Sequence, residues 1–129
     1  MTEDEVRAFV GALDGVRVHV ATEGDGSPEV AWGDTFFHRG EDLQPFATIV
    51  TKDYPGFDEA SDLDRDGVFR VNVHVGRAAL PTDAGDPTAL DEFFRHPTYG
   101  AHGWIAVNNP GARSDEALRG HLIAAAMSS

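Results

Sequence analysis

Within residues 68–75, positions 69–75 alternate strictly between apolar and polar side chains, and this pattern restricts the fold of the chain more than any other feature. The apolar positions are Phe69, Val71, Val73 and Val75. The polar positions between them are Arg70, Asn72 and His74. Successive side chains of a strand point to opposite faces, so the stretch predicts a β-strand with one buried face and one polar face. We expect the apolar face to lie beneath the N- and C-terminal helices.

Periodicity and capping residues predict the remaining elements of one domain that covers residues 1–129. Thr2 and Glu5 fit a capping box, which begins a first helix that ends at Asp14-Gly15. Asp86 is expected to cap a short helix that ends before His96-Pro97, and Ser114 to cap the final helix. Strands are predicted at 16–20, 29–38, 46–51, 68–75 and 102–108. The predicted fold is α+β: a single antiparallel sheet of about five strands, with the N- and C-terminal helices packed on one face.

The acidic balance of the chain restricts its partners. Twenty-two acidic residues face ten basic ones, which gives a formal net charge of -12. Nucleic-acid binding depends on clustered cations that replace phosphate counterions, yet the only lysine is Lys52 and the arginines are scattered. We therefore expect no binding to nucleic acid or to an anionic membrane surface.

Other absences in the sequence narrow the class of protein. The chain has no cysteine, which excludes disulfides and thiolate metal ligands. No apolar run approaches the ~18 residues of a membrane span, and the acidic N-terminus is unlike a signal peptide. We expect a soluble, cytoplasmic protein that is a monomer or a homodimer and uses no cofactor.

The polar face of the strand at 68–75 is the candidate ligand site. Its predicted residues are Arg70, Asn72, His74, Arg77 and Asp34. Arginine supplies a bidentate fork and histidine a titratable donor, which suits a small polar or anionic molecule. Further residues that could join the site are Arg17, His19 and Asp53. The alternative is a structural ladder of cross-strand pairs, each worth roughly 0.2–1 kcal/mol, in which a carboxylate already pairs with Arg70.

Two groups of residues invite a metal-binding interpretation. Asp62, Asp64 and Asp66 copy the opening of an EF-hand loop, but its twelfth position is Val73 where a bidentate Glu belongs. The other group is His96 and His102 with Asp91 or Glu92, and it has no recognised ligand spacing. We predict no metal site, while a cation at the three aspartates stays an open alternative.

Three segments carry a resemblance to a known family. They are Trp32–Phe37, Pro45–Gly56 and Gly67–Arg77. They resemble a family of small actinobacterial proteins of unknown function. The C-terminal part, with Tyr99, Trp104 and Pro110, is more distantly similar to MmcQ/YjbR-like proteins. The resemblance implies a frataxin-like architecture and brings no settled activity.

Two functions remain after these observations. The first is a small-ligand-binding or protein-interaction module without chemistry of its own. The second is a small enzyme that acts on a polar or anionic metabolite, with His74 as acid or base and Arg70 as the anion anchor. A concave pocket that contains both side chains would favour the enzyme.

Overall fold

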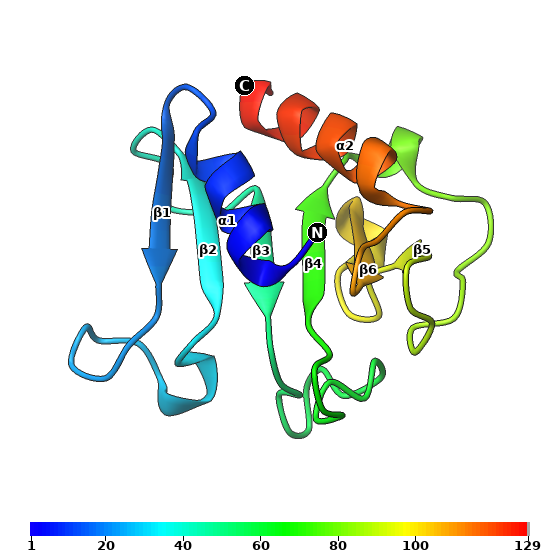
Figure 1. Ribbon diagram of the computed structural model, residues 1–129, viewed down its shortest axis with the longest axis horizontal. Coiled ribbons are helices and arrows are strands. Elements are labelled where there is room, and N and C mark those ends of the chain that lie inside the picture. The colour runs from blue at the N-terminus through cyan, green and yellow to red at the C-terminus, as the bar shows by residue number, and fades with distance from the viewer. Residues whose placement is uncertain (129) are drawn as a thin grey trace.

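An open antiparallel sheet of six strands is the centre of the computed structural model, which describes residues 1–128 (Figure 1). In sequence order the strands are β1 (Val16–Val20), β2 (Thr35–Arg39), β3 (Ala47–Val50), β4 (Arg70–His74), β5 (Phe93–Arg95) and β6 (Trp104–Asn108). Their order across the sheet is β1-β2-β3-β4-β6-β5. The two α-helices are α1 (Glu3–Gly11) and α2 (Asp115–Met127), and short 3-10 helices are η1 (Glu29–Ala31), η2 (Arg77–Ala79) and η3 (Gly100–His102). The predicted α+β class is therefore confirmed, with six strands rather than about five.

Both α-helices cover the same face of the sheet, in front of it in Figure 1. The apolar side of β4 points toward them, because Val71 and Val73 are almost completely buried in one core cluster. The helices contribute to this cluster through Val6, Val10, Leu118 and Leu122. Thr2 and Glu5 form the predicted capping box at the start of α1. The expected packing of the apolar face beneath the terminal helices is confirmed.

The short helix predicted between Asp86 and His96 is wrong, because this segment contains strand β5. Phe93 and Arg95 pair with Val107 and Ile105 of β6, and Phe94 is fully buried. The Asp86 carboxylate accepts hydrogen bonds from the Thr88 amide and hydroxyl, in a local turn rather than at a helix start. A short apolar run fits either element by its sequence, and here the open edge of β6 selects the strand.

The strand predicted at 29–38 begins later than expected. Residues 29–31 form η1, and β2 starts only at Thr35. Gly33 has a positive φ of 91° and its amide donates to the Ala21 carbonyl at 2.8 Å. Glycine adopts this conformation without steric cost, so the chain turns at Gly33 and then enters the sheet. The turn leaves Asp34 immediately before β2.

Among residues 1–128, no α-helix covers the opposite face of the sheet, which is called the helix-free face below. Residues that share this face form rows across neighbouring strands: Phe36, Thr48, Asn72 and Ala106 in one row, and Val50, Arg70 and Asn108 in the next. Two irregular connections lie over part of these rows. One joins β3 to β4 (residues 51–69) and the other joins β5 to β6 (residues 96–103).

Within residues 1–128 there is no helix whose length and apolar character would let it span a bilayer.

Candidate functional site

A pocket of about 480 Å³ opens on the helix-free face, between the two irregular connections. Its floor comes from the central strands and includes Thr48, Arg70 and Asn72. Its walls carry five aromatic side chains: Phe36, Tyr54, Phe57, Tyr99 and Trp104. A volume of this size lies within the range of small-molecule sites, roughly 300–1,000 Å³.

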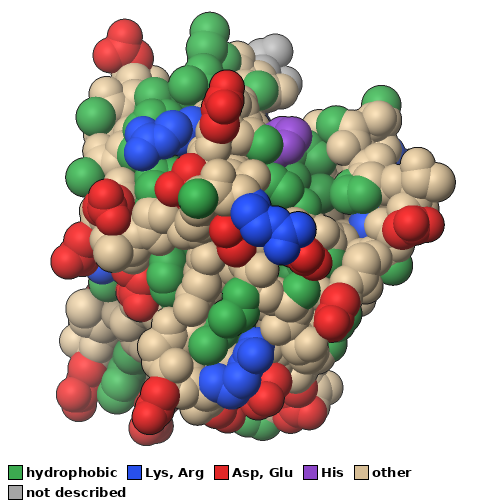
Figure 2. All heavy atoms as spheres, turned by 45° about the vertical axis from the view of Figure 1, so that its right-hand side comes forward, with side chains coloured by type: hydrophobic (Ala, Val, Ile, Leu, Met, Phe, Trp, Pro, Cys, Tyr) green, Lys and Arg blue, Asp and Glu red, His purple; other side chains and the backbone are tan. Residues whose placement is uncertain are grey.

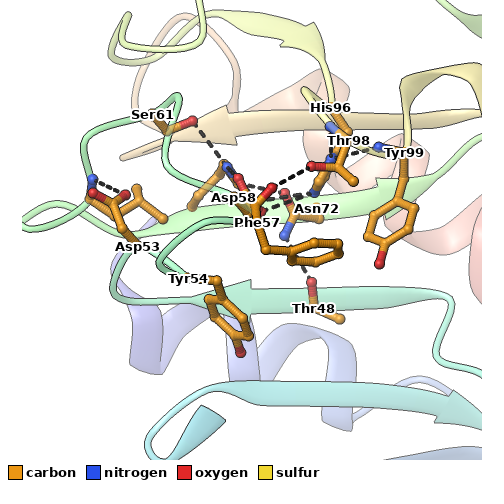
Figure 3. A network of polar contacts seen from close by, with 12 residues as sticks. Thr48, Asp53, Tyr54, Phe57, Asp58, Ser61, Asn72, His96, Thr98 and Tyr99 are labelled. Carbon is orange, nitrogen blue, oxygen red and sulfur yellow. Dashed lines mark hydrogen bonds and ion pairs between the residues drawn. The ribbon is translucent and has the colours of Figure 1, made fainter. Parts of the chain in front are cut away.

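Arg70 is fully buried at the floor and is held by a carboxylate from the connection at 51–69. Its Nη1 donates to Asp58 Oδ1 at 3.1 Å and to Ser61 Oγ at 3.0 Å, while Nη2 donates to Asp58 Oδ2. Its Nε donates to Asn72 Oδ1 at 2.8 Å, and Asn72 Nδ2 donates in turn to Thr48 Oγ1 at 2.9 Å. Arginine and carboxylate form a bidentate pair, so this cation is already neutralised. Figure 3 shows its partners Asp58, Ser61 and Asn72.

His96 closes the same network from the other connection. Its Nδ1 accepts hydrogen bonds from the backbone amides of Thr98 and Tyr99, both at 3.0 Å. The proton of the neutral ring therefore lies on Nε2, which is 3.2 Å from Arg70 Nη2 and 3.6 Å from Asp58 Oδ2. Burial, and next the charge of Arg70, lowers the pKa of His96 to about 4. The ring is neutral at pH 7 and acts as a fixed part of the network.

Asp34 supports a wall of the pocket instead of reaching Arg70. Its buried carboxylate accepts hydrogen bonds from the Thr51 amide at 2.9 Å and from the Tyr54 hydroxyl at 2.5 Å. Lys52 Nζ lies 3.5 Å from the same carboxylate. Burial and the hydrogen bond to Asp34 both raise the pKa of Tyr54. Asp34 thus fixes a neutral phenol in the aromatic wall.

Two aromatic side chains at the mouth of the pocket are exposed to solvent. Phe57 is 55% exposed and Tyr99 is 41% exposed, and their rings meet edge to face with centroids 5.9 Å apart. A hydrogen bond of 3.3 Å from Thr98 Oγ1 to the Phe57 carbonyl joins the two connections beneath them. Figure 3 shows the rings of Tyr54, Phe57 and Tyr99 beside the polar network.

The predicted site residues separate into three groups. Arg70 and Asn72 line the pocket, whereas Asp34 acts behind Tyr54. His74 is exposed and lies outside the pocket lining, with Nε2 donating to the His102 carbonyl at 3.0 Å and its ring 5.5 Å from Trp104. Arg77 lies in η2, also outside the lining. The strand thus places Arg70 and His74 on one face without bringing them into one pocket.

The other polar candidates are engaged elsewhere. Arg17 donates to the carbonyls of Gly40 and Asp42, and His19 contacts Asp25 at 2.8 Å. These contacts hold turns at the β1 edge of the sheet, so Arg17 and His19 do not line the pocket.

The candidate cation residues form no cluster in the part of the chain that the structure describes. No group of three or more His, Asp or Glu side chains there is arranged to hold a metal ion. In the EF-hand-like segment, Asp64 accepts from the Asp53 amide at 3.3 Å, and Asp53 accepts from the Leu63 amide at 2.9 Å. The carboxylates therefore shape the connection between β3 and β4.

Sequence reasoning missed the partner of Arg70 and the aromatic wall. The acidic segment at 57–67 offered four aspartates and one glutamate, and no local signal distinguishes Asp58 from the rest. A charged residue between buried strand positions does indicate that a carboxylate is nearby. The aromatic residues gave a usable signal, because Tyr54, Phe57 and Tyr99 all lie in segments rich in Pro and Gly, where core residues are uncommon.

The fold and this pocket define a class of protein: a small α+β domain with helices on one face of an antiparallel sheet and an aromatic pocket on the other. The chain belongs to the family described as "Family of unknown function (DUF6194)", whose model matches residues 1–129. A comparison with curated proteins gives no match, and a comparison with solved structures gives none either.

Proposed function

We propose that the chain is a binding module for a small molecule, and that the aromatic pocket on the helix-free face is its ligand site. The observation that carries the proposal is the combination of a pocket of about 480 Å³ with exposed aromatic rings at its mouth. Exposed aromatic side chains leave apolar surface in water, which a bound ligand would cover. The floor groups are already paired with one another, so the pocket needs no ligand in order to satisfy them.

The arrangement of Arg70 and His74 does not favour the enzyme alternative. An anion anchor must have a free guanidinium, whereas Arg70 pairs with Asp58 in a buried ion pair. An acid or base must reach the ligand, whereas His74 is not part of the pocket lining. An enzyme would need Arg70 to leave Asp58 and His74 to move into the pocket, whereas a binding module needs neither change.

A fragment screen of the full chain tests this proposal. Fragments of neutral, cationic and anionic character are tested for binding by ligand-observed NMR, and each hit is titrated against the double variant Phe57→Ala/Tyr99→Ala. We expect hits to lose at least about tenfold in affinity, which is about 1.4 kcal/mol of ring contact. Both side chains are partly exposed and lie outside the hydrophobic core cluster, so the variant should keep its fold.

Met127→Ala is the matched control, because Met127 is 80% exposed and lies on α2, on the opposite side of the sheet. The fragments found in the screen should bind Met127→Ala as tightly as they bind the unchanged chain. A screen without hits, or hits that ignore both aromatic substitutions, would contradict the proposal.

Several finer expectations from the sequence remain part of the proposal. They are the frataxin-like and MmcQ/YjbR-like relation, an actinobacterial origin, a cytoplasmic location, and a monomeric or homodimeric state. The chain's acidity supports the further expectation that nucleic acid is not a partner. A protein-interaction module is the other form of this proposal. In that case a side chain of a partner peptide, instead of a small molecule, would bind in the same pocket.

A further inference from the structure

The charged groups of the pocket cancel one another. Asp58 and Arg70 are the only Asp, Glu, Lys or Arg side chains in its lining, and they form a buried pair. A second proton on His96 would have to sit on Nδ1, where it would displace the two amide hydrogen bonds from Thr98 and Tyr99. The floor therefore presents dipoles to a ligand, with no free cation to hold an anion.

The wall of the pocket can bind positive charge. Aromatic rings attract cations through the negative potential of their faces when the cation lies within about 6 Å of the ring centroid. Phe57 and Tyr99 meet edge to face with an interplanar angle of 65°, so the ring that presents its edge keeps both of its faces uncovered by the other ring. Tyr54 adds a third ring whose hydroxyl is bound to Asp34 and thus stays neutral.

The charge of the whole molecule acts in the same direction. The formal net charge is -12, and Figure 2 shows Asp and Glu side chains spread over the visible face, while Lys and Arg side chains there lie apart. A field of this sign concentrates cations at the surface and repels anions. The negative field therefore disfavours an anionic ligand.

Resting on the proposed binding function, we infer that the pocket takes a small organic cation, an ammonium group that carries apolar substituents. The aromatic wall would surround the cation, and the apolar substituents would cover the exposed rings of Phe57 and Tyr99. Charge complementarity between an acidic molecule and a cationic ligand selects this class over a neutral or anionic one.

Three probes of nearly equal shape test the charge preference: choline, 3,3-dimethylbutan-1-ol and 3,3-dimethylbutanoate. Each is titrated into the full chain at pH 8 and binding is followed by amide chemical shifts at low and at moderate salt. We expect choline to bind at least about fivefold more tightly than the alcohol, and the carboxylate to bind most weakly. Added salt should weaken choline binding and leave the alcohol unchanged, because only the charged probe feels the screened field.

Tyr99→Leu and Tyr99→Phe form a matched pair of variants, since Leu keeps apolar volume while Phe keeps the ring. Tyr99→Leu should lose the preference for choline over the alcohol, and Tyr99→Phe should retain it. Equal binding of the alcohol, tighter binding of the carboxylate, or a preference that survives Tyr99→Leu would overturn the inference. If choline does not bind while neutral fragments from the screen do, the cation inference fails alone; if no fragment binds, the binding function fails with it.

Discussion

Arg70 is the largest side chain that the structure buries completely, and its ion pair with Asp58 determines the behaviour of the pocket floor. Replacing Arg70 with Met would leave the Asp58 carboxylate buried without its partner. Removing one member of a buried pair typically costs about 3–5 kcal/mol. We expect Arg70→Met to lower the free energy of unfolding by that amount in a urea titration.

His74→Leu is the control for this substitution, because His74 lies on the same strand but is exposed. It should change the free energy of unfolding by less than about 1 kcal/mol. The double variant Arg70→Met/Asp58→Leu should recover part of the loss, because an apolar pair needs no charge compensation. An Arg70→Met protein as stable as the unchanged chain would show that the ion pair contributes little.

His96 should make the stability of the fold depend on pH. Its pKa is about 4 in the folded chain, against an ordinary value of 6.5. The unfolded chain therefore takes up a proton as the pH falls through 6.5, while the folded chain does so only near pH 4. This stability is complete above pH 6.5 and is lost progressively down to pH 4, by about 3 kcal/mol in total.

His96→Asn isolates this contribution, because an asparagine oxygen can still accept from the Thr98 and Tyr99 amides. The pKa values of His38 and His121 are also lowered, chiefly by burial, and both remain in the variant. Urea titrations at pH 7 and pH 5 should therefore show a smaller loss for His96→Asn than for the unchanged chain. Equal losses in the two proteins would assign the pH dependence to other groups.

At the scale of an element, the start of α2 depends on a residue distant in sequence. Ser114 stands at the N-cap, but its hydroxyl donates to Asp91 Oδ1 at 2.6 Å and caps no helix amide. The Asp91 carboxylate accepts from the amides of Gly111, Arg113 and Ser114 at 2.7–3.0 Å. These bonds, led by that from the Ser114 hydroxyl, lower the pKa of Asp91 to about 2.

Asp91→Ala should therefore destabilise the fold by about 2 kcal/mol in a urea titration, through the lost hydrogen bonds to the turn before α2 and a strained backbone. Asp91 has a φ of 57°, a left-handed conformation that asparagine also tolerates. Asp91→Asn keeps an acceptor oxygen and should lose less than half as much. If the alanine and asparagine variants were equally stable, the carboxylate would not anchor the helix.

At the scale of the whole molecule, the net charge of -12 predicts how the protein behaves toward nucleic acid. Lys52, the single lysine, is bound to the Trp32 carbonyl at 2.5 Å and lies beside Asp34. Few cations are left to replace the counterions of a phosphate backbone. We expect no complex with a 20-base-pair DNA duplex at physiological salt in a mobility-shift titration. A sub-micromolar complex that weakens with salt would be the contrary result.

The sequence by itself determined the features that depend on local pattern. The alternation at 68–75 fixed which side of β4 is buried, because a strand turns each successive side chain to the opposite face. The capping box fixed the start of α1, since Thr2 and Glu5 satisfy amides only three residues apart. The charge balance supports the expectation that nucleic acid is not a partner, which stays a prediction.

Only the tertiary structure decided which residues meet across the chain. Arg70 pairs with Asp58 instead of Asp34 or Asp53, because the Tyr54–Asp58 turn places the Asp58 carboxylate over β4. The segment at 93–95 became a strand, because β6 offered an unpaired edge. The aromatic pocket joins residues from both irregular connections, and loop closure over such separations depends on contacts that no local window of sequence contains.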